Sequence, residues 1–323
     1  MIRFTLRRLT ILLMAMAVIN CLAFSYAVIG RWVHESKNPF LAATQGPPPI
    51  LTSYADYVQD IFQRNFGAMP TARGMTIGGA VSEALGNSLG LLAIAFALSL
   101  IIGLALGLRA VRTSPPSVAG WLTPLTTVGL AMPSFYIGGL LIAGSIYYLF
   151  LGWGDRLPLP LGGFGWDIHL VMPTLALMAL PTLKIAQSTS TLLVEELNKQ
   201  YIVAARSVGH TWRAIRRRHA LRNVVAPIIL SIAGSFRTLV VELILVEWLF
   251  RWPGIGRLLG TTLIPPATAT AFSTDIGAAF LHPPIVATVV TIFAAIFLLT
   301  DLLASLLARA LDPRLQATEA GNG

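Results

Sequence analysis

The chain has 323 residues, of which 55% are hydrophobic and only 11% are charged, and its mean hydropathy is +0.73. Soluble domains are about 45–50% apolar and about 25% charged, so this composition excludes an ordinary water-soluble protein. Apolar runs of roughly twenty residues recur along the chain, and each is long enough to cross a bilayer. The net charge of +9 comes from residues between these runs, which argues against a nucleic-acid-binding face.

The first apolar run, residues 9–29, follows three arginines and is longer than the apolar core of a signal peptide. No convincing small-x-small cleavage site follows it, so residues 1–29 are predicted to be an N-terminal tail and a retained membrane helix. Polar and turn-forming residues then dominate residues 30–86, which predicts an external loop or a small lobe.

Five further apolar runs predict an all-α membrane protein with about six transmembrane helices. We expect residues 87–314 to form a five-helix core and residues 315–323 to form a C-terminal tail. Counted from the run at residues 9–29, the third and fourth runs contain prolines, which remove backbone donors and predict kinked interior helices. The five runs cover residues 87–108, 121–150, 169–193, 224–250 and 284–308.

The distribution of positive charge predicts the orientation of these helices. If the N-terminus is cytoplasmic, most of the 23 Lys and Arg residues fall on the cytoplasmic side, including the arginines of residues 206–222. This excess is what the positive-inside rule requires. We therefore expect both termini to be cytoplasmic.

Residues 195–223, between the fourth and fifth runs, have the most informative pattern. They predict a helix that ends at Gly209, a polar break, and a second short basic helix with Trp212 and Ile215 on one face. Such a helix could dock in a groove of a partner protein. The alternatives are an amphipathic helix in the lipid headgroup region and a basic turn that obeys the positive-inside rule.

The order of residues in this segment resembles the cytoplasmic loop of binding-protein-dependent ABC transporter permeases. The resemblance starts from Ala204-Ala205-Arg206-Ser207-Val208-Gly209, an Ala-Ala-x3-Gly core, with Ile215 and Pro227 after it. The flanking residues 201–206 and 218–223 are similar to those of the oligopeptide, dipeptide and nickel branch. Residues 132–135, 169–177, 246–257 and 312–314 match motifs of the same branch in the expected order.

The resemblance implies partners that this chain does not contain. It implies two ABC ATPase subunits, a second homologous permease subunit and an extracytoplasmic solute-binding protein, assembled in a bacterial or archaeal cytoplasmic membrane. The chain has no Gly-rich loop that ends in Gly-Lys-Ser/Thr, so ATP and magnesium are expected to bind in the partner ATPases and no cofactor in this chain. The ATPase-coupling residues that the resemblance implies are Ala204, Ala205, Gly209, Ile215 and Leu221.

Polar residues within the predicted spans are candidates for the solute path, because charges in a bilayer are costly and usually face a bundle interior or water. Lys184 could instead snorkel to the surface, and Arg237 and Glu242 could pair with other chains. The candidates are Ser134, Lys184, Arg237 and Glu242.

Two other functions compete with transport: an intramembrane enzyme and a membrane anchor. The histidines show no His-Glu-x-x-His spacing and no Gly-x-Ser-x-Gly turn occurs, so no catalytic residue is predicted. Cys21 is the only cysteine, which excludes an intrachain disulfide and a cysteine-based zinc site, and no metal site is predicted. Gln187, Ser190 and Gln200 depart from the family pattern and leave the solute open among peptides, nickel complexes, glutathione-like compounds, opines and sugars.

Overall fold

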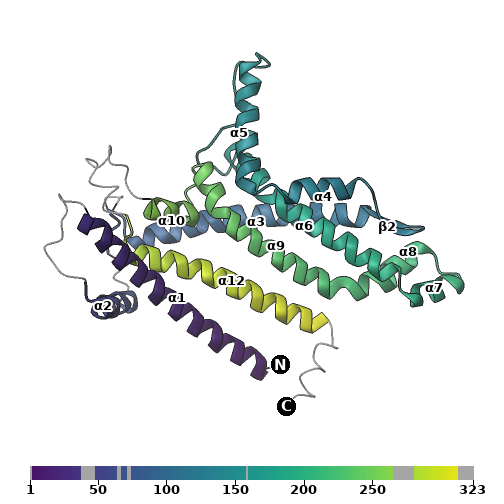
Figure 1. Ribbon diagram of the computed structural model, residues 1–323, viewed down its shortest axis with the longest axis horizontal. Coiled ribbons are helices and arrows are strands. Elements are labelled where there is room, and N and C mark those ends of the chain that lie inside the picture. Colours follow the sequence, from purple (N-terminus) through teal and green to yellow (C-terminus); the bar gives the residue numbers. More distant parts are fainter. Residues whose placement is uncertain are drawn as a thin grey trace. The chain divides into compact units, whose positions relative to one another are not determined.

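The computed structural model describes residues 2–37, 48–63, 67–70, 74–157, 159–264 and 280–311. Long helices dominate these residues, as Figure 1 shows, and the prediction of an all-α membrane protein is confirmed. The sheet that they contain is one hairpin of two three-residue strands. The chain forms two compact units, the first made of Met1–Gly90 and Arg251–Leu298, the second of Leu91–Phe250 and Leu299–Gly323.

The first unit is built around a cluster of aromatic and aliphatic side chains that includes Phe24 and Tyr57. Asn20 lies beside this cluster within an apolar helix and donates hydrogen bonds to Tyr57 Oη at 3.3 Å and to Thr291 Oγ1 at 2.9 Å. Such bonds between helices satisfy a polar side chain in an apolar setting. The elements of this unit are α1 (Ile2–Lys37), α2 (Ile50–Phe62), the start of α3 (Ile77–Arg109), α10 (Ile255–Leu263) and most of α12 (Pro283–Leu311).

The region predicted as a loop or small lobe, residues 30–86, contains more helix than expected. α1 continues to Lys37, supported by an ion pair between Arg31 and Glu35 at 2.8 Å, one turn apart. α3 begins at Ile77 rather than near residue 87, because Thr76 Oγ1 accepts a hydrogen bond from the Gly79 N–H and caps the helix. Between them, the amphipathic α2 accounts for residues 50–62.

The second unit contains the rest of α3, the end of α12 and the remaining elements. After the end of α3, the chain passes through a hairpin and then through helices that pack around α6. In chain order they are β1 (Val111–Thr113), β2 (Pro116–Val118), α4 (Leu122–Leu130), α5 (Ser134–Phe150), a 3-10 turn (Ile168–Leu170), α6 (Val171–Leu197), α7 (Gln200–Ser207), α8 (Trp212–Ile215), a π-helical turn (Arg216–Ala220) and α9 (Leu221–Leu249).

Two glycines let α3 approach α6 closely. A Cβ at Gly103 would lie 2.8 Å from the Thr182 carbonyl oxygen, and one at Gly107 would lie 2.8 Å from that of Ala186. Both distances are shorter than real carbon contacts. The spacing Gly-x-x-x-Gly is therefore a packing motif here, which lets two helix backbones meet in a membrane.

The third predicted span, residues 121–150, is broken rather than kinked. α4 and α5 are bent by 96° at residues 131–133, and Pro133 precedes the first residue of α5. The far end of α5 projects away from the other helices of the second unit (Figure 1). Among the residues that the structure describes, five helices are long and apolar enough to cross a membrane, and there are up to six spans if the bent pair counts as one.

Some predictions lie outside the described residues. The motif at 312–314 and the tail at 315–323 belong to these. The cytoplasmic orientation of the two termini stays a prediction.

Candidate functional site

The coupling loop, defined here as residues 195–223, begins where α6 ends and leads into α9. α7 ends at Ser207, and Gly209 follows with a φ of +94°, a left-handed conformation that only glycine adopts without strain. Thr211 Oγ1 then accepts a hydrogen bond from the Ala214 N–H and caps α8. The predicted helix, glycine and polar break are confirmed, but the second helix runs through a π-helical turn directly into α9.

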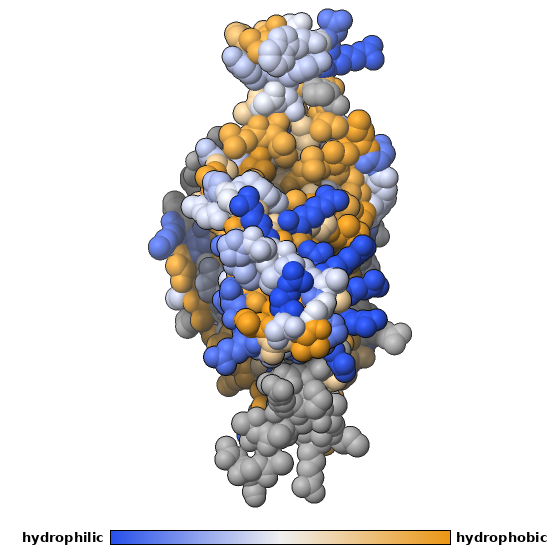
Figure 2. Space-filling model, turned by 90° about the vertical axis from the view of Figure 1, so that its right-hand side faces the viewer, coloured by the Kyte–Doolittle hydropathy of each residue, from blue (hydrophilic) through white to orange (hydrophobic). Residues whose placement is uncertain are grey.

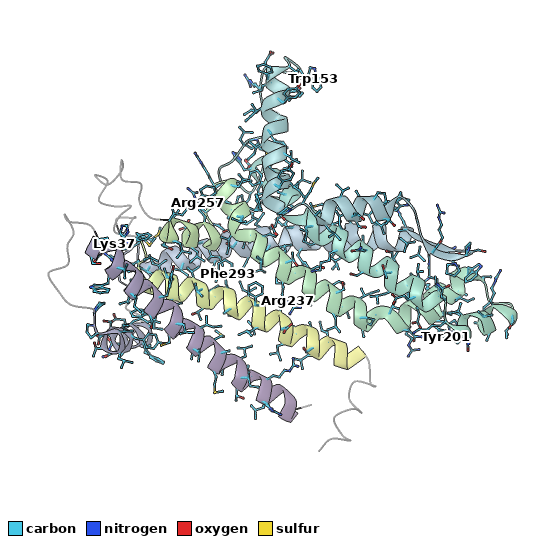
Figure 3. All side chains as sticks on the ribbon, in the orientation of Figure 1. Lys37, Trp153, Tyr201, Arg237, Arg257 and Phe293 are labelled. Atoms are coloured by element: carbon cyan, nitrogen blue, oxygen red, sulfur yellow. The ribbon has the colours of Figure 1, made fainter. Side chains whose placement is uncertain are left out.

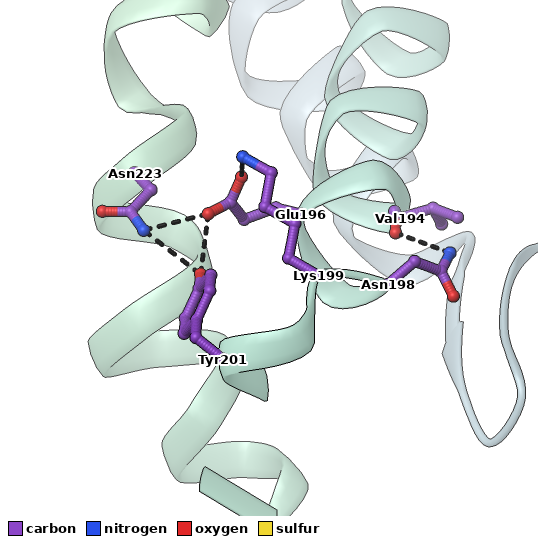
Figure 4. Close-up of polar contacts among 6 residues, drawn as sticks. All are labelled: Val194, Glu196, Asn198, Lys199, Tyr201 and Asn223. Carbon is purple, nitrogen blue, oxygen red and sulfur yellow. Dashed lines mark hydrogen bonds and ion pairs between the residues drawn. The ribbon is translucent and has the colours of Figure 1, made fainter. Parts of the chain in front are cut away.

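Glu196 joins the three segments of the loop at one buried carboxylate (Figure 4). Its side chain is almost fully buried, and Oε1 accepts hydrogen bonds from the Tyr201 hydroxyl at 2.7 Å and from Asn223 Nδ2 at 2.9 Å. Oε2 forms an ion pair with Lys199 Nζ at 2.5 Å. The end of α6, the first turn of α7 and the first turn of α9 are thereby held together.

The hydroxyl of Tyr201 is held as a donor in this network. Burial, together with the hydrogen bond to Glu196, raises the pKa of Tyr201 to about 12. The hydroxyl therefore stays protonated at physiological pH and keeps donating to the carboxylate.

The five predicted coupling residues separate into a buried and an exposed group. Ile215 is fully buried and Leu221 packs against the same apolar cluster, together with Trp212. The apolar face of α8 is thus turned toward the chain's own interior and is not free to enter a groove of a partner. Ala205 is half-buried, whereas Ala204 and Gly209 are exposed.

Apolar and basic side chains share the surface at the tip of the coupling loop. Val203 on α7 and Val208, which directly precedes Gly209, are largely exposed. Arg206 lies over the Trp212 ring, with its guanidinium carbon 5.2 Å from the ring centroid, and donates a hydrogen bond to the His210 carbonyl oxygen. Figure 2 views this end of the chain and shows hydrophilic side chains around small apolar areas. The other exposed arginines are Arg213, Arg217, Arg218 and Arg222.

All four predicted path residues have partners within the second unit, and three of them link its membrane helices α5, α6 and α9. Ser134 is buried, and its backbone N–H at the start of α5 donates to Glu242 Oε2 at 3.0 Å. The carboxylate therefore caps α5 from another helix, where it also complements the helix dipole. Lys184 Nζ donates to Thr238 Oγ1 at 3.2 Å and links α6 to α9.

Arg237, the fourth path residue, forms an ion pair in which Nη1 lies 2.6 Å from Asp301 Oδ1. Figure 3 places Arg237 near the middle of α9, and Asp301 lies within the span Pro283–Leu307. Both side chains are exposed over about half of their surface. The pair thus lies at membrane depth without being buried in the chain.

Comparison with known proteins identifies the family. Residues 99–317 match the family described as the binding-protein-dependent transport system inner membrane component. The chain belongs to this family. It is therefore a multi-pass permease of the cytoplasmic membrane, and the predicted peptide and nickel branch agrees with its relatives.

The relatives are peptide and glutathione permeases. The permease is 27% identical to the dipeptide transport system permease protein DppB of Lactococcus lactis over 98% of this chain and 100% of that protein. It is 24% identical to the oligopeptide transport system permease protein AppB of Bacillus subtilis, over 83% and 81% of the two chains. It is 27% identical to the glutathione transport system permease protein GsiC of Salmonella choleraesuis, over 83% and 80%.

Two residues of this permease were missed by sequence reasoning. Asp301 interrupts the last apolar run, so a search for charges within spans could have found it. Glu196 left no such signal, because it stands among polar residues at the end of a span. Its burial follows from contacts with Asn223, 27 positions away.

Proposed function

We propose that this permease forms half of the solute path of an ATP-binding-cassette importer for peptides or a related small solute. Its membership of the family supports a transport role, and relatives named for dipeptide, oligopeptide and glutathione transport support the solute class. A second homologous permease would complete the path, and an extracytoplasmic binding protein would deliver the solute.

ATP hydrolysis is proposed to take place in two separate ATPase subunits, which would bind ATP and magnesium. The coupling loop would receive their movement. The observation that carries this proposal is the Glu196 network, which fixes α7 to the ends of both α6 and α9. A force applied at the exposed tip would therefore be transmitted to two membrane helices.

The predicted coupling residues fall into an exposed and a buried group, which supports two roles within this loop. Ala204 and Gly209, with Val203, offer an exposed surface for an ATPase. Ile215 and Leu221 lie beneath it and would keep the loop rigid. The buried pair acts by supporting the surface rather than by touching the partner.

The variant Gly209→Trp tests this assignment. A bulky side chain at the exposed tip, on a backbone with a φ of +94°, would displace the ATPase surface and strain the turn. We expect ATP-dependent uptake into proteoliposomes to fall at least tenfold, with less ATPase subunit co-purified and an unchanged amount of permease in the membrane.

Gly152→Trp is the matched control. Gly152 is also exposed, also has a positive φ of +69°, and has no atom within 4 Å of an added Cβ among the described residues. It lies beyond α5, away from the coupling loop in sequence, and should retain the ATPase subunits. A fully active Gly209→Trp complex would remove the basis for the coupling assignment.

A further inference from the structure

The ion pair between Arg237 and Asp301 is exposed at a depth where lipid would otherwise be the solvent. The exposed fractions of the two side chains are 44% and 55%. α9 extends from Leu221 to Leu249 and α12 from Pro283 to Leu311, so neither residue lies in the last turn of its helix. Snorkelling to the membrane surface is therefore not available to Asp301, whose side chain is short.

Charged side chains that face hydrocarbon are costly, and those found in spans almost always face a water-filled cavity or another protein surface. The same face of α9 continues with exposed apolar residues. Val241, Leu245 and Trp248 follow Arg237 at helical spacing and are each about half exposed. This face combines one charge pair with an apolar stripe.

We propose that this face lines the water-filled solute path and that the Arg237–Asp301 pair is a binding site for solutes with both an ammonium and a carboxylate group. Free peptides are the class that combines these two charges with apolar side chains. The inference rests on the proposed function, because it assumes that solute crosses beside α9.

A solute with both charges can replace the contact between Arg237 and Asp301 without leaving either residue unpaired. A solute ammonium can replace Arg237 at Asp301, and the solute carboxylate can then pair with Arg237. Every charge keeps a partner during this exchange. A solute with only one charge would leave either Arg237 or Asp301 unpaired, and an unpaired charge in a poorly solvated site is penalised strongly.

Lys184 and Glu242 are less suited to this role. Lys184 is bonded to Thr238 and half-buried, and Glu242 caps the start of α5 through the Ser134 N–H. A solute that bound either of them would have to disrupt contacts that hold helices of the second unit together. Exchange at the Arg237–Asp301 pair also breaks a contact between α9 and α12, but there the solute gives each charge a new partner.

The experiment uses the single cysteine of this chain. Cys21→Ser produces a cysteine-free permease, to which either Val241→Cys or Ile101→Cys is added. Ile101 is an exposed apolar residue of α3 and serves as the control. The complex with its partners is reconstituted in liposomes and labelled with charged, membrane-impermeant methanethiosulfonate reagents.

We expect Val241→Cys to react at least tenfold faster than Ile101→Cys. Dialanine should slow that reaction several-fold, whereas N-acetyl-dialanine amide, which carries neither charge, should not. Asp301→Asn should abolish the protection by dialanine. If Val241→Cys reacts as slowly as the control, lipid or a helix of the second permease covers this face and the inference is overturned. The inference is also overturned if the two compounds protect Val241→Cys equally, or if neither protects it.

Failure of the inference is distinguishable from failure of the proposed function. ATP-dependent uptake by the Cys21→Ser complex with unreactive Val241→Cys would overturn the binding site alone. Loss of the ATPase subunits from the complex would overturn the proposed function itself.

Discussion

Glu196 shows how one side chain can determine the geometry of a whole loop. Its carboxylate has three partners, and a glutamine can satisfy only some of them and carries no charge to pair with Lys199. We expect Glu196→Gln to destabilise the permease by about 1.5–3 kcal/mol, the usual range for hydrogen bonds to charged groups. The melting temperature (Tm) of the purified complex measures this effect.

Glu195→Gln provides the matched control for that variant. Glu195 is the preceding residue of α6 and is exposed. Its replacement should leave the Tm unchanged, as surface substitutions usually do. Equal Tm values for both variants would show that the buried network does not stabilise the loop.

His282 gives the first unit a dependence on pH. Burial, together with the charge of Arg31, lowers the pKa of His282 to about 4 from an ordinary value of 6.5. At pH values between about 4 and 6.5, His282 is protonated in the unfolded chain but mostly neutral in the folded one. The stability contributed by neutral His282 is therefore complete above about pH 6.5 and is lost as the pH falls toward 4.

The variant His282→Gln should weaken this dependence. We expect the Tm of the wild-type chain to fall more steeply between pH 7 and pH 4.5 than that of the variant, as measured in detergent at constant ionic strength. Parallel curves would mean that His282 is not protonated on unfolding.

At the scale of elements, the contact between α3 and α6 depends on the absence of side chains. Gly103→Ala would place a Cβ 2.8 Å from the Thr182 carbonyl oxygen and force the helices apart. Gly86→Ala in the same helix meets nothing within 4 Å among the described residues and replaces a poor helix former. The two variants should shift the Tm in opposite directions, Gly103→Ala downward by several degrees and Gly86→Ala slightly upward.

A loss of stability in Gly86→Ala equal to that in Gly103→Ala would contradict the packing account.

The Gly-x-x-x-Gly spacing is visible in the sequence, so this contact was predictable. The 96° bend between α4 and α5 was not, since Pro133 predicts only that the helix is interrupted. The angle depends on where α5 is held, and the bond from Ser134 to Glu242 shows that a distant helix contributes to this.

At the scale of the whole molecule, the apolar runs and the motif of the coupling loop were sufficient to predict the fold class, the number of spans and the family. These signals are local in the sequence. α2 was missed because its 13 residues stand in a polar region and are too short to suggest a span. The inward face of α8 was also missed, because Trp212 and Ile215 look the same in sequence whether they meet a partner or the chain's own core.

The most direct test of the proposed importer is affinity purification of the tagged chain from native membranes in mild detergent, with mass spectrometry of the proteins that remain bound. The account predicts two copies of an ABC ATPase, one homologous permease and a solute-binding protein, whose bound ligand would identify the solute. Recovery of this chain alone, under conditions that preserve other such complexes, would contradict the account and favour an enzyme or a membrane anchor.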